Sequence, residues 1–89
     1  MKLLICDDED DILMMLQRFL SAKGYDLLLA KNGEEALKQA QHQPDLILLD
    51  IAMPPPDGLE VCRRIRRFLD CPILFLSARI SENDKVKGF

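Results

Sequence analysis

The sequence predicts an α/β protein built on a doubly wound parallel sheet, and two observations support this prediction. Four short segments are mostly apolar with little polar alternation, which is typical of strands covered on both faces. Stretches with helical spacing separate them, so crossovers are expected to place helices on both faces of the sheet. The chain has no internal repeat, linker or low-complexity segment, so we expect one domain over residues 1–89.

Composition and charge place the chain among soluble globular proteins. Hydrophobic residues make up 48% of the 89 residues and charged residues 30%. The formal net charge of -3 provides no basic surface, so this segment is not expected to bind nucleic acid directly. The first apolar run stops at Asp7, which is too short for a secretory signal, and no stretch is long enough to span a bilayer. We therefore expect a cytoplasmic protein without membrane association.

The cysteines favour packing over cross-linking. Cys6, Cys62 and Cys71 form an odd set, and each lies inside or beside an apolar segment. This pattern is typical of reduced, buried thiols in a cytoplasmic protein. A zinc site is not expected, because no two cysteines have ligand spacing and His42 is the single histidine.

The first strand is predicted at Lys2–Cys6, and a helix follows from about Asp10 to Lys23. Acidic residues in the first turn of that helix suit the positive end of its dipole. Gly24 is expected to end the helix as a C-terminal cap. Helical spacing predicts a buried face made of Ile12, Leu16, Phe19 and Leu20.

The second strand is predicted at Tyr25–Ala30, followed by a turn at Asn32-Gly33. The next helix is expected from about Glu34 to His42, and Pro44 ends it. Its packing residues should be Ala36, Leu37 and Ala40.

The third strand is predicted at Asp45–Leu49. The loop from Asp50 to Asp57 contains three consecutive prolines, which restrict the backbone and exclude a helix there. A helix is then expected from Gly58 to Leu69. Its buried side chains should be Leu59, Cys62, Ile65 and Leu69.

The fourth strand, Ile73–Leu76, is predicted to need cover on both faces and a neighbour on each side. A last helix is expected to begin at Ser81 or Asn83. Without a further strand, the fourth strand would be an apolar edge that pairs readily with other chains. We therefore expect that the 89-residue chain forms a homodimer, swaps elements or aggregates, or else is one part of a longer chain.

Polar side chains follow three of the predicted strands. Asp7 and Asp8 come after the first strand, Asp50 after the third and Ser77 after the fourth. The carboxyl ends of parallel strands share one edge of a sheet, where ligands bind in open α/β proteins. If the first and third strands are neighbours, Asp7, Asp8 and Asp50 meet in one crevice.

A cluster of carboxylates at this edge would need a cation. Two carboxylates about 5 Å apart, at an effective dielectric constant of about 20, repel each other by roughly 3 kcal/mol. A hard divalent ion such as Mg²⁺ removes this conflict and accepts oxygen ligands. With the ion bound, one carboxylate is suited to attack a phosphoryl group.

Four motifs together resemble the receiver domain of bacterial two-component response regulators. They are Asp7-Asp8, the run Leu48–Pro54, the turn Asp57-Gly58, and the run Leu76–Arg79. Each motif is weak alone, but their order and spacing make the resemblance specific, and matching segments run through all 89 residues.

The resemblance implies roles for individual residues. Asp50 would be the phosphoacceptor, taking a phosphoryl group from a sensor histidine kinase. Asp8, Asp50 and the backbone carbonyl of Ala52 would ligate Mg²⁺, with Asp7 holding a metal-bound water. Ser77 would donate a hydrogen bond to the phosphoryl group and move as the switch.

The resemblance also implies a flavodoxin-like, CheY-like fold with strand order 2-1-3-4. The family's domain continues for about another 30 residues, roughly one strand-helix unit. That unit carries a lysine which contacts the phosphoryl group and an aromatic switch residue. Neither has a counterpart here, and Lys85 and Lys87 lie in the wrong segment. The fifth strand and last helix are therefore expected to be missing, leaving the receiver domain incomplete at its C-terminus.

The sequence leaves open the type of output domain in the full-length protein and two alternative functions for this chain. The runs Asp57–Arg66 and Leu76–Arg79 together look most like receivers fused to winged-helix DNA-binding domains, the OmpR/PhoB class. This resemblance would make the full protein a transcriptional regulator. One rival is a protein interaction module that is not phosphorylated. The other is an aspartyl-phosphate hydrolase, which is disfavoured because position 52 is Ala and supplies no second carboxylate. The resemblance implies a signalling domain and not an enzyme.

Overall fold

The structure is a computed structural model that describes residues 1–76. The predicted alternation of strands and helices is confirmed over this range. Ser77, and the helix expected from Ser81 or Asn83, lie outside the described residues. In chain order the elements are β1 (Lys2–Cys6), α1 (Asp10–Ala22), β2 (Asp26–Ala30), α2 (Gly33–Gln39), the short 3₁₀ helix η1 (Ala40–His42), β3 (Leu46–Asp50), α3 (Gly58–Ile65) and β4 (Ile73–Leu76).

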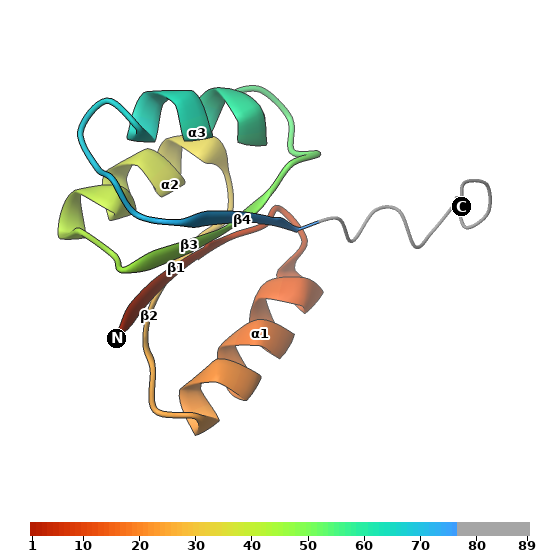
Figure 1. The fold of residues 1–89 in the computed structure, drawn as a ribbon. Coiled ribbons are helices and arrows are strands. Elements are labelled where there is room, and N and C mark those ends of the chain that lie inside the picture. The colour runs from red at the N-terminus through yellow and green to blue at the C-terminus, as the bar shows by residue number, and fades with distance from the viewer. Residues whose placement is uncertain (77–89) are drawn as a thin grey trace.

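The four strands form one parallel sheet in the order β2-β1-β3-β4, as predicted. Helix α1 covers one face of this sheet, and α2 and α3 lie together over the other (Figure 1). The register aligns Cys6 with Ala30 on one side and with Leu49 on the other. The carboxyl ends of β1, β2 and β3 therefore lie side by side at one edge.

Local signals in the sequence explain where the helices begin and end. Gly24 follows α1 with a φ of 92°, a conformation that glycine adopts without strain, and its N–H donates to Ser21 O at 2.9 Å. Helix α2 is capped by Asn32, whose Oδ1 accepts from the N–H of Glu35 at 2.8 Å. Asp57 caps α3 in the same way.

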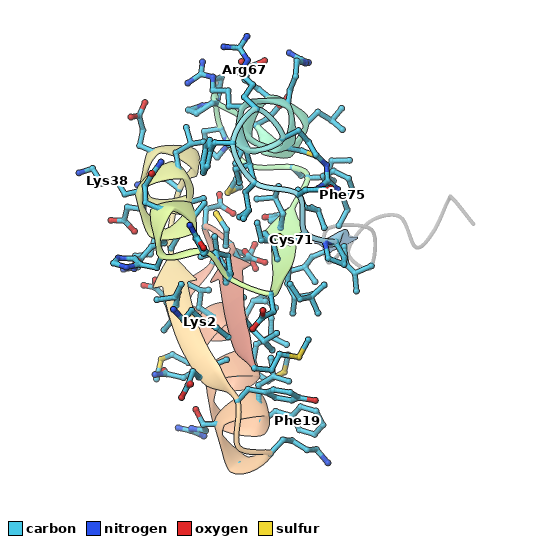
Figure 2. The ribbon with its side chains drawn as sticks, turned by 60° about the vertical axis from the view of Figure 1, so that its left-hand side comes forward. Lys2, Phe19, Lys38, Arg67, Cys71 and Phe75 are labelled. Atoms are coloured by element: carbon cyan, nitrogen blue, oxygen red, sulfur yellow. The ribbon has the colours of Figure 1, made fainter. Side chains whose placement is uncertain are left out.

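The larger core lies between the sheet and the pair α2 and α3. It joins strand residues to the buried faces of both helices, and it includes Cys71, labelled in Figure 2, which lies just before β4. The three cysteines are free thiols, and Cys6 and Cys71 are buried. The fully buried large side chains of this core are Leu4, Ile47, Leu49, Val61 and Ile65.

Two predicted helix faces were partly wrong. On α1, Phe19 is 58% exposed, and Leu13 is the buried residue. On α3, Leu59 is 52% exposed, and Val61 is fully buried. Spacing at three and four residues identifies an apolar stripe, but the packing of the helix on the sheet decides which edge of the stripe is covered.

Helix α3 is also shorter than predicted, because it ends at Ile65 and not at Leu69. The N–H of Arg67 donates to Arg64 O at 3.2 Å, and the N–H of Phe68 donates to Ile65 O at 3.0 Å. These bonds span three residues, so the chain tightens into turns after the helix.

Strand β4 pairs with β3, and in residues 1–76 it has no second neighbour. Its Leu74 is 55% exposed and its Phe75 is 41% exposed, so the cover expected on both faces is incomplete within this range. No helix in this range is long and apolar enough to cross a membrane.

Candidate metal centre

The acidic residues selected from the sequence come together at one edge of the sheet. Strands β1 and β3 are neighbours, with Ile5 beside Leu48 and Cys6 beside Leu49. Asp7 follows β1 directly, and Asp50 is the last residue of β3. The two carboxylates therefore leave adjacent strands at the same level, which is the condition that the prediction required.

Three carboxylates form the cluster. Asp7, Asp8 and Asp50 each offer an oxygen, and these oxygens all lie within 4.8 Å of one another. Asp7 and Asp50 are each only 1% exposed, whereas Asp8 is exposed to solvent. The cluster thus has a buried base and an open side, and Asp8 lies at the open side.

Short backbone turns fix the two buried carboxylates. Asp7 Oδ1 accepts a hydrogen bond from the N–H of Glu9 at 2.9 Å. Asp50 Oδ1 accepts one from the N–H of Ala52 at 3.0 Å. In each case the side chain bonds to the backbone two residues later, which helps to orient the carboxylate.

The second oxygen of Asp7 has no hydrogen-bond partner among the described residues, although it is buried. Desolvation, together with the charges of Asp50 and Asp8, raises the pKa of the Asp7 carboxyl to about 6, although the hydrogen bond from the Glu9 N–H lowers it. At the separation of the cluster, two carboxylates repel each other by about 3 kcal/mol at an effective dielectric constant of about 20.

These properties fit a hard divalent cation such as Mg²⁺. The donors are all oxygens, one buried oxygen lacks a partner, and the open side leaves room for water or phosphate oxygens to complete the coordination. A cation at this position would also relieve the repulsion that raises the pKa of Asp7.

Two sulfur-containing side chains, Cys6 and Met53, pack next to the site, a contact that no motif in the sequence indicates. The Cys6 thiol donates to Asn32 O at 3.4 Å and lies 3.4 Å from Met53 Sδ. Burial raises the pKa of this thiol to about 12, and the charges of Asp50 and Asp7 contribute. Cys6 is therefore a neutral packing group and not a nucleophile.

The structure does not test the predicted roles of the other two site residues, Ala52 and Ser77. Ala52 is exposed and lies in the turn after Asp50, where its N–H orients the Asp50 carboxylate. A role for its carbonyl as a metal ligand stays a prediction. Ser77 lies outside the described residues, so its predicted contact with a phosphoryl group also stays a prediction.

Comparisons with known proteins agree with this arrangement. The family described as the response regulator receiver domain matches residues 3–89. A relative from Bacillus subtilis, the alkaline phosphatase synthesis transcriptional regulatory protein PhoP, is 49% identical over 89 residues, which cover 98% of this chain and 37% of that protein. The chain thus spans well under half the length of the curated relatives it matches.

Solved structures show the same fold. The receiver domain of the hybrid histidine kinase CckA is 34% identical with a TM-score of 0.83, and the match covers 93% of this chain and 79% of that one. A structure of the histidine kinase ThkA in complex with the response regulator protein TrrA matches at 43% identity with a TM-score of 0.78, covering 86% of this chain and 68% of that one.

Proposed function

The chain belongs to the response regulator receiver family of two-component signalling, and from this premise we propose that Asp50 is its phosphoacceptor. One observation carries the assignment. Asp50 ends the central strand β3 as a buried carboxylate, within 4.8 Å of two further carboxylates at the ligand-binding edge of a parallel sheet. The other two carboxylates directly follow the neighbouring strand β1, so a cation could bridge the ends of both strands.

The proposed reaction is transfer of a phosphoryl group from a phosphohistidine of a sensor histidine kinase. A carboxylate oxygen of Asp50 attacks phosphorus, a new P–O bond forms, and the P–N bond to the imidazole breaks. The imidazole leaves with the electron pair and is protonated from solvent. Asp50 suits this role because the Ala52 N–H holds one of its oxygens, which fixes the direction of the other.

Asp8, Asp50 and the backbone carbonyl of Ala52 are the proposed Mg²⁺ ligands, and Asp7 is proposed to hold a metal-bound water. Bound Mg²⁺ supplies charge neutralisation for the phosphoryl oxygens and for the carboxylates. The unpartnered, buried oxygen of Asp7 supports this assignment, because a water held there would satisfy it. Ser77 is proposed to donate a hydrogen bond to the phosphoryl group and to act as the switch residue.

The proposed partners follow from the relatives. The structure that pairs ThkA with TrrA supports a sensor histidine kinase as donor. The transcriptional regulatory role in the name of PhoP supports a DNA-binding output domain in the complete protein, of the OmpR/PhoB class. We place the protein in the cytoplasm, treat residues 1–89 as part of one receiver domain, and retain a homodimer or domain swap as predictions.

The chain is a signalling domain and not a classical enzyme. An aspartyl-phosphate hydrolase would need a second carboxylate two residues after Asp50 as its general acid, and position 52 is Ala. An interaction module that is never phosphorylated is the competing proposal, and the experiment below separates it.

The test is incubation of the 89-residue chain with acetyl phosphate and Mg²⁺, followed by intact mass measurement. We expect a gain of one phosphoryl group that is absent in Asp50→Asn and retained in Asp11→Asn, which removes a carboxylate from the exposed start of α1. Beryllofluoride with Mg²⁺ should shift the amide resonances around Asp50. No modification and no shift in a folded chain would support the interaction module, and turnover of a phosphoester would support the hydrolase.

A further inference from the structure

Helix α3 begins in direct contact with the backbone of Asp50. Gly58 is its first residue and is buried. A Cβ placed on Gly58 would lie 2.6 Å from the carbonyl oxygen of Asp50 and 2.7 Å from the Cα of Ile51. Real Cβ atoms essentially never come closer than 3.0 Å to such atoms, so any other residue would force a shift of at least 0.4 Å.

We propose that Gly58 is a positioning residue for Asp50, because the missing side chain lets α3 seat directly on the backbone that carries the phosphoacceptor. This inference rests on the proposed function for the role of Asp50. It adds that α3, which contributes no side chain to the carboxylate cluster, sets where one carboxylate lies.

Packing holds both partners of this contact, the end of β3 and the start of α3, in place. Asp50 belongs to β3, a central strand between β1 and β4, where its register partner is Leu76. On the other side, Val61 and Ile65 are fully buried and fix α3 against the sheet. The contacting atoms on both sides are backbone, which cannot rotate away as the end of a flexible side chain can.

The start of α3 is also fixed by its cap. Asp57 Oδ1 accepts from the N–H of Glu60 at 3.0 Å, and the Asp57 carbonyl accepts from the N–H of Val61 at 2.9 Å. The residue before Gly58 is therefore held by the first turn of the helix. A substitution at Gly58 would act on Asp50 instead of being absorbed by the loop.

The carboxylate would move with its backbone. Asp50 Oδ1 is tied to the N–H of Ala52, so a displaced Asp50 or Ile51 changes that bond and the distance to Asp7 and Asp8. Functional groups must stay within about 0.5 Å of their productive geometry. The forced shift of at least 0.4 Å comes close to this limit, so metal affinity should fall on the order of tenfold.

Gly33 provides a control of similar crowding, because none of the three atoms nearest to a Cβ there belongs to Asp50. It is the first residue of α2, and a Cβ there would lie 2.6 Å from the carbonyl oxygen of Pro56 and 2.7 Å from Cγ2 of Val61. Gly33→Ala should therefore lower stability much as Gly58→Ala does. The atoms that this Cβ would meet belong to Pro56 and Val61 and not to residues 50–52, so the turn from Asp50 to Ala52 should change less than in Gly58→Ala.

The test compares both variants in the 89-residue chain. Amide hydrogen exchange and Mg²⁺ titration are each monitored by NMR. In Gly58→Ala we expect faster exchange of the Ala52 N–H and a Kd for Mg²⁺ raised on the order of tenfold. In Gly33→Ala both values should stay within about twofold of the wild type. Equal changes in the two variants, or no change in a folded Gly58→Ala chain, would overturn the proposal.

Failure of the proposed function gives a different result. If the wild type binds Mg²⁺ but acetyl phosphate leaves Asp50 unmodified, the phosphoacceptor assignment fails, while the exchange of Ala52 still decides the role of Gly58. If Gly58→Ala does not fold even in sucrose at low temperature, Asp57→Ala and Asn32→Ala replace the pair. They remove the caps of α3 and α2, and only Asp57→Ala should accelerate exchange at Ala52; equal exchange in both would overturn the proposal.

Discussion

Two carboxylates of the acidic edge, Asp7 and Asp50, are buried as deeply as the hydrophobic core, yet burial has opposite effects on the two regions. Leu49 and Ile65 are fully buried, and Asp7 and Asp50 retain 1% of their exposure. Burial of an aliphatic side chain stabilises a fold by about 1.5–3 kcal/mol. Burial of a carboxylate without a complete set of hydrogen bonds costs free energy, and the second oxygen of Asp7 is such a case.

The core and the acidic edge are adjacent in the chain, because each buried carboxylate directly follows a core residue. Leu49 and Asp50 are consecutive in β3, and Cys6 and Asp7 are consecutive at the end of β1. The strands are held by the core for most of their length, and they present carboxylates where they end. The comparison shows how a domain tolerates an unfavourable cluster: the apolar part of each strand stabilises the fold and fixes the carboxylates in place.

The largest effect is expected from breaking the core. Ile65→Ala should lower the free energy of unfolding by about 2–5 kcal/mol, because it removes a fully buried side chain between α3 and the sheet. Urea unfolding of the 89-residue chain measures this. Leu59→Ala, on the same helix but 52% exposed, should cost less than about 1 kcal/mol. Similar costs for the two variants would contradict the packing described for α3.

The free energy of unfolding should depend on pH, because burial of Asp7 at the acidic edge disfavours its ionised form. The pKa of Asp7 is raised to about 6 from an ordinary value of 3.8, so the folded state binds this proton more tightly than the unfolded state. The stability from protonated Asp7 is complete below about pH 4 and is lost as pH rises through about 6. The loss should be on the order of 1–3 kcal/mol.

The measurement is the free energy of unfolding of the metal-free chain between pH 4 and 7.5, compared with Asp7→Asn. Other carboxylates titrate in both proteins, so the difference between the two curves isolates Asp7. A difference that does not change across this range would show that Asp7 is not destabilised by burial.

Magnesium should reverse part of this cost. At a Mg²⁺ concentration ten times the Kd, binding to the folded state alone adds about 1.4 kcal/mol of stability. Thermal unfolding with Mg²⁺ and with EDTA at pH 7.5 measures the gain. Asp8→Asn should abolish most of it, because Asp8 contributes an oxygen to the cluster. Stabilisation that persists undiminished in Asp8→Asn would place the ion elsewhere.

The smallest effect is expected on the outer side of α1. Phe19 is 58% exposed and lies with Lys23 Nζ 5.1 Å from its ring centroid (Figure 2). Phe19→Ala should therefore change the free energy of unfolding by no more than about 0.5–1 kcal/mol. A loss above 2 kcal/mol in urea unfolding would show that Phe19 packs in the core, as its helical spacing predicts.

Much of the fold and the candidate site was predictable because the signals are local. Two apolar runs end at Asp7 and Asp50, and Gly24 ends the first helix, so the strand and helix boundaries are within a few residues of the prediction. Convergence of Asp7, Asp8 and Asp50 needed one more condition, the adjacency of the first and third strands, and β1 and β3 meet that condition.

Other features were not predictable from spacing. Leu13 and Val61 replace Phe19 and Leu59 as buried residues, because an apolar stripe wider than the contact leaves several ways to seat a helix. The contact of Gly58 with the backbone of Asp50 joins residues that a proline-rich loop separates in the chain. In the sequence, a glycine after an acidic residue predicts only a turn, so this contact could not be inferred.

The sequence by itself determined the order and type of the elements and the chemistry of the residues at the strand ends, since backbone preference and apolar periodicity act over a few residues. Only the tertiary structure decided how deeply Asp7 and Asp50 are buried, which helix residues face the sheet, and how closely α3 approaches the phosphoacceptor strand. Those quantities depend on atoms far apart along the chain, and close packing of the whole domain sets them together.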